Sequence, residues 1–291
     1  MKLEYQVTEQ DQTINQILKN KLHISSRLMN KLISNKLVKV NNSPCDTRFI
    51  VNVGDLISID LSYEEDNSNI IACNEPIEII YEDDWLLVLN KPKGIATHPS
   101  TLHFDDSLSN RVKFYFDSIS LRKKIRPVNR LDLNTSGLII FAKNEYIQEC
   151  LINQMQTHEF TKEYIALVHG ILDDKKGVID KPISRKDGSI IERCISSSGK
   201  RAVTRYEVLS EHDNYSLVKC KLETGRTHQI RVHFASIGHS LVGDTLYGSN
   251  KEIDGHILIC YKLGFIHPVS NKKISFELKD TINILQKLTM V

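Results

Sequence analysis

The chain lacks the sequence features of exported and membrane proteins. Its N-terminus, Met1-Lys2-Leu3-Glu4-Tyr5, has no apolar run of the kind that a secretory signal requires. No stretch approaches the roughly 18 apolar residues that a membrane-spanning helix needs. These absences predict a cytoplasmic protein.

Cysteines are few, and they are scattered along the chain. No two of the six form a C-x-x-C motif, so their spacing supports neither a zinc cluster nor a disulfide framework. We expect reduced, mostly buried thiols at Cys45, Cys73, Cys150, Cys194, Cys220 and Cys260.

An excess of charge of one sign is also missing. The formal net charge is only +2, so any basic surface for an acidic partner must be local. A hydrophobic content of 41% and a charged content of 25% are typical of a soluble globular protein. A length of 291 residues is enough for one large domain and a small module.

The composition changes near residue 65, which divides the chain into two regions. The first region is expected to contain two short helices, because apolar residues recur there at helical spacing, and then short strands marked by alternation. The expected elements are a helix capped by Thr13 that ends near Asn20, a helix capped by Ser25 or Ser26, and strands at 36–41 and 56–61.

Basic residues gather in the first region. Between residues 19 and 48 there are seven basic residues and one acid, giving +6. A basic helix followed by a small β-element resembles the S4-type RNA-binding module, with its core at residues 12–62; a solvated helical face is the alternative. The residues expected to bind RNA are Arg27, Lys31, Lys36 and Lys39.

The second region alternates strands and helices without internal repeats. It has the pattern of an α+β fold with much pairing of neighbouring strands, and no regular βαβ repeat. The expected strands are 77–81, 85–90, 138–142, 163–168, 202–209, 216–222, 257–265 and 273–278. The expected helices are 106–118, 145–158 (capped by Asn144) and 227–237. The predicted domains are therefore 1–66 and 76–291, with a polar, acidic linker at 67–75.

The segment Val128–Leu138 contains a charged pair suited to chemistry. If residues 128–132 are extended, Arg130 and Asp132 point the same way, because side chains alternate along a strand. A nearby cation favours the charged form of a carboxylate, as a nucleophile requires. The polar turn at 134–137 would leave Asp132 at an accessible loop edge. An ordinary surface turn is the alternative for an isolated Leu-Asp pair.

A second polar segment runs from Leu222 to His239. Within the helix expected at 227–237, Gln229 and His233 would share one face near its start with Arg226, which directly precedes it. A helix N-terminus with an arginine is a favourable place for a phosphate or carboxylate.

The histidines of this second segment do not predict a metal site. His228 and His233 are five residues apart, which places them roughly 140° apart around a helix. A helical zinc site would use a spacing of four. We therefore expect no metal.

Tyr164 lies on the strand expected at 163–168, on one face with Ala166 and Val168. Most strand tyrosines are half-buried core residues, and that interpretation stays open. The functional alternative is a ring and phenol lying over a flipped base.

Together these segments resemble the RluA-type pseudouridine synthases. The resemblance covers essentially all of residues 76–280, and although no single motif is decisive, six in the same order are specific. The matching segments are Lys91-Pro92…Gly94…His98-Pro99, Arg130-Leu131-Asp132…Thr135-Ser136-Gly137-Leu138, Lys162…Tyr164…Ala166…Val168…Gly170, Thr224–His233, Gly238-His239 with Gly243-Asp244…Tyr247-Gly248, and Leu263…Phe265…His267-Pro268.

The resemblance implies a fold and a set of roles. The fold would be a mixed, largely antiparallel sheet with flanking helices and loops, preceded by the small S4-like α/β domain. Asp132 would be the nucleophile, Tyr164 the active-site tyrosine and Arg226 the arginine that pairs with the aspartate. Arg130 would lie near the flipped nucleotide, and Leu258 would pack in the base pocket.

Two positions depart from the family pattern. Asn129 stands where many members have histidine, and Ile259 stands where a Leu-His-Ala triplet usually has its histidine. Neither position is the nucleophile, so we expect activity to survive. Details of RNA positioning that depend on those histidines do not carry over.

The function implied is isomerisation of uridine to pseudouridine in structured RNA, by a monomer without cofactor. The uridine must be extruded into the pocket at a cost of a few kcal/mol in lost stacking. Attack at the ribose C1′, attack at the uracil C6 and formation of a glycal all stay open. Alternatives are a non-catalytic RNA-binding assembly factor, an N-glycosidase and action on transfer RNA. The S4-like region favours large-subunit ribosomal RNA.

Overall fold

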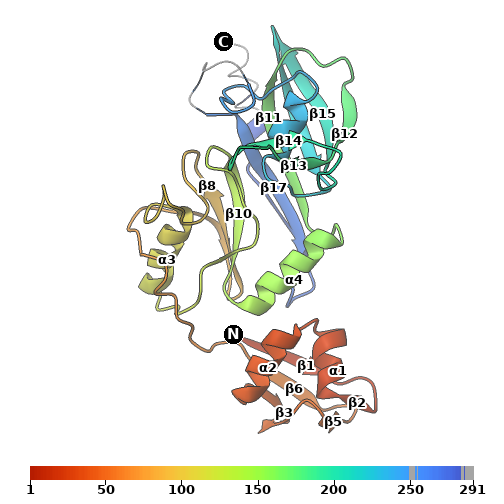
Figure 1. Cartoon of the computed structure of the whole chain (residues 1–291). Helices are drawn as coiled ribbons and strands as arrows, with labels where there is room; N and C mark the ends of the chain where they lie inside the picture. The colour runs from red at the N-terminus through yellow and green to blue at the C-terminus, as the bar shows by residue number, and fades with distance from the viewer. Residues whose placement is uncertain (249–252, 254, 283–284, 286–291) are drawn as a thin grey trace.

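The computed structural model describes residues 1–248, 253, 255–282 and 285. A small N-terminal module lies at one end of a larger C-terminal domain built around a long twisted sheet (Figure 1). The predicted second domain extends to residue 291, and its residues 283–284 and 286–291 lie outside the described part of the chain.

The N-terminal module packs two helical segments on a four-stranded antiparallel sheet of order β1-β6-β3-β4. Ser25 caps the second helix, as predicted, and Thr13 caps the first through a reciprocal capping box with Gln16. The elements are β1 (Lys2–Gln6), β2 (Gln12–Thr13), α1 (Ile14–Gln16), the π-helical turn η1 (Ile17–Lys21), α2 (Ser26–Ser34), β3 (Val38–Val40), β4 (Ser43–Pro44), β5 (Ile50–Val51) and β6 (Leu56–Asp60).

The sequence did not predict β1, and the expected module core of 12–62 omits it. Strand β1 pairs with β6 over its whole length, in the register Leu3↔Ile59. Both Leu3 and Ile59 are buried, so β1 closes the apolar face of the module. Its short alternation is weak as a local signal and is fixed by pairing with a strand more than 50 residues away.

The C-terminal domain is α+β and its sheet is mixed and largely antiparallel, which confirms the prediction. The strand order is β12-β15-β16-β11-β17-β10-β8-β7, with β18 beside β17 and β9 beside β10. The strands are β7 (Glu78–Glu82), β8 (Leu86–Lys91), β9 (Arg126–Pro127), β10 (Ser136–Ala142), β11 (Thr161–His169), β12 (Lys176–Asp180), β15 (Val203–His212), β16 (Tyr215–Leu222), β17 (Leu258–Ile266) and β18 (Lys273–Glu277).

Among the described strands, β10 and β17 form the one parallel pair, and this pair joins the two halves of the sheet. The pairing is short, with Ser136 opposite Ile259 and Gly137 opposite Cys260. A Cβ atom on Gly137 would lie 2.3 Å from the Cys260 carbonyl oxygen, so only glycine allows this approach. Because parallel strands begin at the same edge, the chain entering β10 lies beside the start of β17.

The helices of the C-terminal domain are α3 (Leu108–Ser118), α4 (Glu145–Gln156) and α5 (Gln229–Ala235). Asn144 caps α4 as predicted, since its side chain accepts a hydrogen bond from the Ile147 amide. The helix predicted from residue 227 begins later, because His228 has a left-handed backbone with φ +58°. A hairpin of β13 (Ile183–Arg185) and β14 (Arg193–Ile195) projects beside α5.

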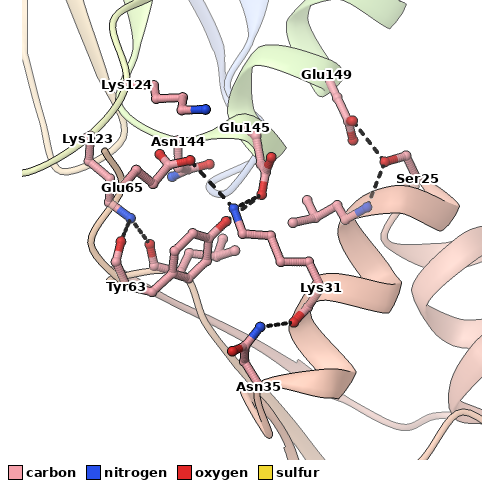
Figure 2. Close-up of polar contacts among 12 residues, drawn as sticks. Ser25, Lys31, Asn35, Tyr63, Glu65, Lys123, Lys124, Asn144, Glu145 and Glu149 are labelled. Atoms are coloured by element: carbon pink, nitrogen blue, oxygen red, sulfur yellow. Dashed lines mark hydrogen bonds and ion pairs between the residues drawn. The ribbon is translucent and has the colours of Figure 1, made fainter. Parts of the chain in front are cut away.

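A polar cluster joins the N-terminal module to the C-terminal domain (Figure 2). The Lys31 ammonium lies 2.8 Å from a Glu145 carboxylate oxygen and 4.2 Å from the centre of the Tyr63 ring. Arg126 forms a bidentate ion pair with Glu65, with N–O distances of 2.6 and 2.7 Å. The chain between the two folded parts therefore takes part in an ion-pair network.

This cluster gives Lys31 contacts within the protein, and its predicted contact with RNA stays a prediction. The face of α2 that carries Lys31 is turned toward the start of α4, where Glu145 lies. A cation held by two carboxylates and an aromatic ring is occupied within the protein, because Glu65 is also only 3.5 Å away.

Candidate active site

The loop that carries Asp132 is held by the segment that follows β8. The Thr97 hydroxyl donates to the Leu131 carbonyl at 2.8 Å, and the Gly94 amide donates to the Leu133 carbonyl at 3.0 Å. The backbone is therefore fixed on both sides of Asp132, whose side chain is 27% exposed.

Lys91 also supports the loop that carries Asp132. Its side chain is fully buried, and its ammonium donates to the carbonyls of Pro92, Ile95 and Leu133 at 3.0, 2.7 and 3.1 Å. Burial lowers the pKa of Lys91 to about 8, while the Asp132 carboxylate acts to raise it. Lys91 is thus a buried cation that uses its three donors to hold the loop at Asp132.

The arginine that pairs with Asp132 is Arg231, not Arg226. Arg231 Nη1 lies 3.2 Å from Asp132 Oδ2. The same guanidinium is fixed by Asp244, which accepts from Nε at 2.7 Å and from Nη2 at 2.9 Å. Burial alone would lower the pKa of Arg231, but hydrogen bonds and charges from both aspartates outweigh it and raise that pKa.

Arg226 has a different position because α5 begins only at Gln229. It lies in the exposed turn before the helix, and its Nε donates to the Arg201 carbonyl at 3.0 Å. Its side chain lines the same pocket as Asp132 without pairing with it. The signal that could have identified Arg231 is its place in the matched segment 224–233, but its orientation depends on where the helix starts.

His228 is a second partner of Asp132 that the sequence did not identify. Its Nε2 lies 3.8 Å from Asp132 Oδ2, and its Nδ1 lies 2.7 Å from the Tyr247 hydroxyl oxygen. The backbone of His228 is left-handed, with φ +58°. Burial lowers the pKa of His228, and the neighbouring Asp132 only partly opposes this shift.

The residues predicted from the sequence meet at one pocket. Asp132 lies before β10, Tyr164 on β11 and Leu258 at the start of β17, and all three line this pocket together with Arg130 and Arg226. Tyr164 and Leu258 are buried, 6% and 5% exposed, and give it an apolar wall. The pocket lies where the two halves of the sheet join, which explains how distant segments build one site.

A wider cleft of about 670 Å³ opens beside this pocket. It shares Arg130 and Asp132 with the pocket and extends between the loop at 96–103 and the β13–β14 hairpin. The hairpin carries Ile190 and Ile191, which are 81% and 59% exposed. A large, open, partly cationic cleft suits a polymeric substrate better than a small metabolite.

The two positions that depart from the family pattern have packing roles. The side chain of Asn129 is 4% exposed, accepts from the Ile140 amide at 2.9 Å and donates to the Leu138 carbonyl at 3.2 Å, so it braces β10. Ile259 packs against a small apolar cluster behind the sheet.

The remaining residues predicted to bind RNA lie on the module surface. Arg27, Lys36 and Lys39 are exposed and form no ion pair within the described part of the protein. No set of three or more histidine, cysteine or acidic side chains is arranged for a metal in the described ranges. Within those ranges no helix has the length and apolar character needed to cross a bilayer.

Two family models match the chain. Residues 85–236, more than half of the chain, match the RNA pseudouridylate synthase family. Residues 1–57 match the N-terminal domain of the RluD ribosomal pseudouridine synthase.

Bacterial proteins of known sequence are similar over most of the chain. An uncharacterized RNA pseudouridine synthase of Bacillus subtilis, YhcT, is 37% identical over 264 residues, which is 90% of this chain and 87% of YhcT. The ribosomal large subunit pseudouridine synthase D of Vibrio cholerae is 34% identical, covering 87% of this chain and 82% of its own length. The Zymomonas mobilis enzyme of the same name is 38% identical over 74% of each chain.

A solved structure has the same fold. Human RNA pseudouridylate synthase domain containing 1 superposes with a TM-score of 0.58 at 25% identity, covering 75% of this chain and 96% of the human chain. The chain therefore belongs to the RluA-type RNA pseudouridine synthases, enzymes that isomerise uridine in RNA, and it has their S4-like N-terminal domain.

Proposed function

We propose that Asp132 is the nucleophile of this enzyme and that its substrate is a uridine in large-subunit ribosomal RNA. The observation that carries the first part is the position of Asp132, a partly exposed carboxylate beside Arg231 at the edge of a pocket with an apolar wall. The second part is supported by the RluD-type N-terminal domain and by relatives named for the large ribosomal subunit.

The geometry suits a uridine that has left its helix. Leu258 and the Tyr164 ring offer an apolar surface to a flipped base, while Arg130 and Arg226 at the rim offer charge to its phosphates. Arg231 lies against Asp132 Oδ2 and holds that carboxylate oxygen in place. Attack at C1′, attack at C6 and glycal formation are all compatible with this arrangement.

Tyr164 acts mainly through its ring in this proposal. Burial raises the pKa of Tyr164, and a side-chain contact with Cys260 and the charge of Asp132 add to that rise. A protonated phenol can donate a hydrogen bond or shield the base from water, whereas removal of the C5 proton by a phenolate is disfavoured. We expect the enzyme to act as a monomer in the cytoplasm.

Asp132→Asn tests the nucleophile, because it keeps the side-chain shape and removes the charge. We expect no detectable pseudouridine in a large-subunit RNA fragment, with RNA affinity within about twofold of the wild type. Isomerisation leaves the mass of the RNA unchanged. Pseudouridine would therefore be read by mass spectrometry as the added mass of a carbodiimide adduct after the RNA is treated with that reagent. Asp213→Asn, in an exposed turn with φ +50°, is the matched control and should stay active.

The same assay separates the alternatives. Retained turnover in Asp132→Asn would overturn the role of Asp132, and release of free uracil by the wild type would indicate a glycosidase. Mapping the pseudouridines lost from a strain without this protein identifies the RNA, and losses confined to transfer RNA would contradict the ribosomal substrate.

A further inference from the structure

A chain of polar contacts connects the β13–β14 hairpin to Asp132. The Arg193 backbone amide donates to the Tyr247 hydroxyl oxygen at 2.8 Å. That oxygen lies 2.7 Å from His228 Nδ1, and His228 Nε2 faces Asp132 Oδ2 at 3.8 Å. The sequence predicted no role for Arg193, Tyr247 or His228.

The donors and acceptors in this series of hydrogen bonds determine which atoms carry the protons. A backbone amide can only donate, so the Tyr247 oxygen is the acceptor of the Arg193 contact. The phenol proton then needs an acceptor of its own, and His228 Nδ1 is the other partner of this hydroxyl in the described part of the chain. When the hydroxyl donates to His228 Nδ1, that nitrogen carries a lone pair.

A neutral imidazole with a lone pair on Nδ1 carries its proton on Nε2. Burial favours the neutral form of His228, as do the positive charges of Arg231 and Arg193, whereas Asp132 and Asp244 oppose it. The ring consequently directs an N–H bond at the Asp132 carboxylate.

We infer that Tyr247 is a positioning residue that fixes His228 as its Nε2–H tautomer, so that His228 and Arg231 together hold Asp132 Oδ2. This inference rests on the proposed role of Asp132. Both contacts are to Oδ2, and Oδ1 has no protein hydrogen-bond partner within the described residues. The arrangement leaves Oδ1 as the oxygen that acts on the nucleotide.

The His228 contact is longer than a hydrogen bond in the free enzyme, which is common before substrate binds. Closure of the pocket on a nucleotide would shorten the distance between His228 Nε2 and Asp132 Oδ2. Oδ2 would then accept from His228 as well as from Arg231 while charge moves during the reaction. The Tyr247 ring also lies under the Arg231 guanidinium, 5.0 Å from its centre, and edge-on to the His228 ring at 5.6 Å. Tyr247 therefore contacts both partners of Asp132.

The tautomer can be read directly by nuclear magnetic resonance. In the full chain labelled with ¹⁵N-histidine and without RNA, we expect the His228 signals to show a protonated Nε2 and an unprotonated Nδ1. A His228→Gln variant assigns the signals. Tyr247→Phe keeps the ring and removes the hydroxyl that fixes the tautomer. His228 in this variant should therefore show a mixture of the Nε2–H and Nδ1–H tautomers.

Kinetics provide the second measurement. Tyr247→Phe should lower kcat about tenfold with KM within about twofold, because one oriented donor is lost while the RNA surface is unchanged. Tyr81→Phe removes a comparable hydroxyl, bonded to Asp83 far from the pocket, and should leave kcat unchanged.

A protonated Nδ1 in the wild type would overturn the inference, and so would a Tyr247→Phe variant with both tautomer and kcat unchanged. The tautomer is observed without RNA, so it stands apart from the test of Asp132. If Asp132→Asn retained activity while the Nε2–H tautomer was found, the proposed function would fail and the positioning of His228 would remain.

Discussion

Arg231 illustrates how a single side chain can be shared between structure and chemistry. Two of its nitrogens bind Asp244, which is 1% exposed, and the third faces Asp132. The buried pair orients the guanidinium, so that it reaches Asp132 without losing side-chain entropy when RNA binds.

Asp244→Asn should therefore damage both stability and turnover. The amide cannot balance the buried Arg231 charge, so we expect a loss of about 3 kcal/mol in unfolding free energy and a lower kcat. Urea denaturation and the carbodiimide assay measure the two effects, with Asp213→Asn as the exposed control. Full stability in Asp244→Asn would show that the ion pair is not needed to hold Arg231.

His256 predicts a pH dependence of stability. Burial lowers its pKa to about 4, helped by the charge of Arg231, and its Nε2 lies 2.9 Å from the Thr135 hydroxyl. Because the unfolded chain takes up the proton near pH 6.5 and the folded chain only near 4, stability falls as pH decreases through this window and levels off below it.

The His256 contribution is isolated by comparison with His256→Asn, which has no titrating group there. Between pH 7 and pH 5 the wild type should lose about 2 kcal/mol more unfolding free energy than the variant. Equal losses in both proteins would show that His256 keeps an ordinary pKa in the fold.

At the scale of elements, the short parallel contact between β10 and β17 is the feature that builds the site. It brings the Asp132 loop, which lies on one half of the sheet, to β17 on the other half. Strand β17 begins with Leu258 and pairs with β11, which carries Tyr164. The contact depends on Gly137, whose φ is +108° and whose Cα faces the Cys260 backbone.

Gly137→Ala should be strongly destabilising. Its Cβ would meet the Cys260 carbonyl at 2.3 Å in an unfavourable backbone conformation, so we expect a loss on the order of 3 kcal/mol or more. Gly188→Ala is the matched control, because Gly188 has φ +73° but open space around it, and should cost about 1 kcal/mol. Similar losses in thermal unfolding for the two variants would contradict the packing argument.

At the scale of the whole molecule, the S4-like module is attached by more than a linker. The expected linker at 67–75 has no regular secondary structure, and its Cys73 amide and Ile71 carbonyl bond to Asn110 of the C-terminal domain. Together with the cluster around Lys31 in Figure 2, these contacts hold the basic surface of the module at a fixed place relative to the pocket.

The two kinds of lysine on the module should respond differently to RNA. Lys39→Met removes an exposed charge, so the slope of log affinity against log salt should fall by about one. Lys31→Met removes a charge already paired with Glu145 and Glu65, so its slope should match the wild type. An equal reduction of slope in both variants would show that Lys31 also contacts RNA.

Much of this protein follows from its sequence alone. The alternation and caps of the chain predicted eight strands and the helices α3, α4 and α5 of the C-terminal domain within a few residues, because those signals are local. The strands β9, β12, β13 and β14 were not predicted. The segments around Asp132, Tyr164 and Leu258 were also recognised from the sequence, and they line one pocket.

Tertiary structure decided the partners. The left-handed backbone of His228 delays the start of α5, and this shift exchanges Arg226 for Arg231 beside Asp132. Strand β1 forms by pairing with β6, and Lys31 is directed to Glu145 by the docking of two folded parts. The sequence identified Asp132, Tyr164 and Leu258 as side chains of the site, whereas the partners of Asp132 depend on distances between segments that no local pattern records.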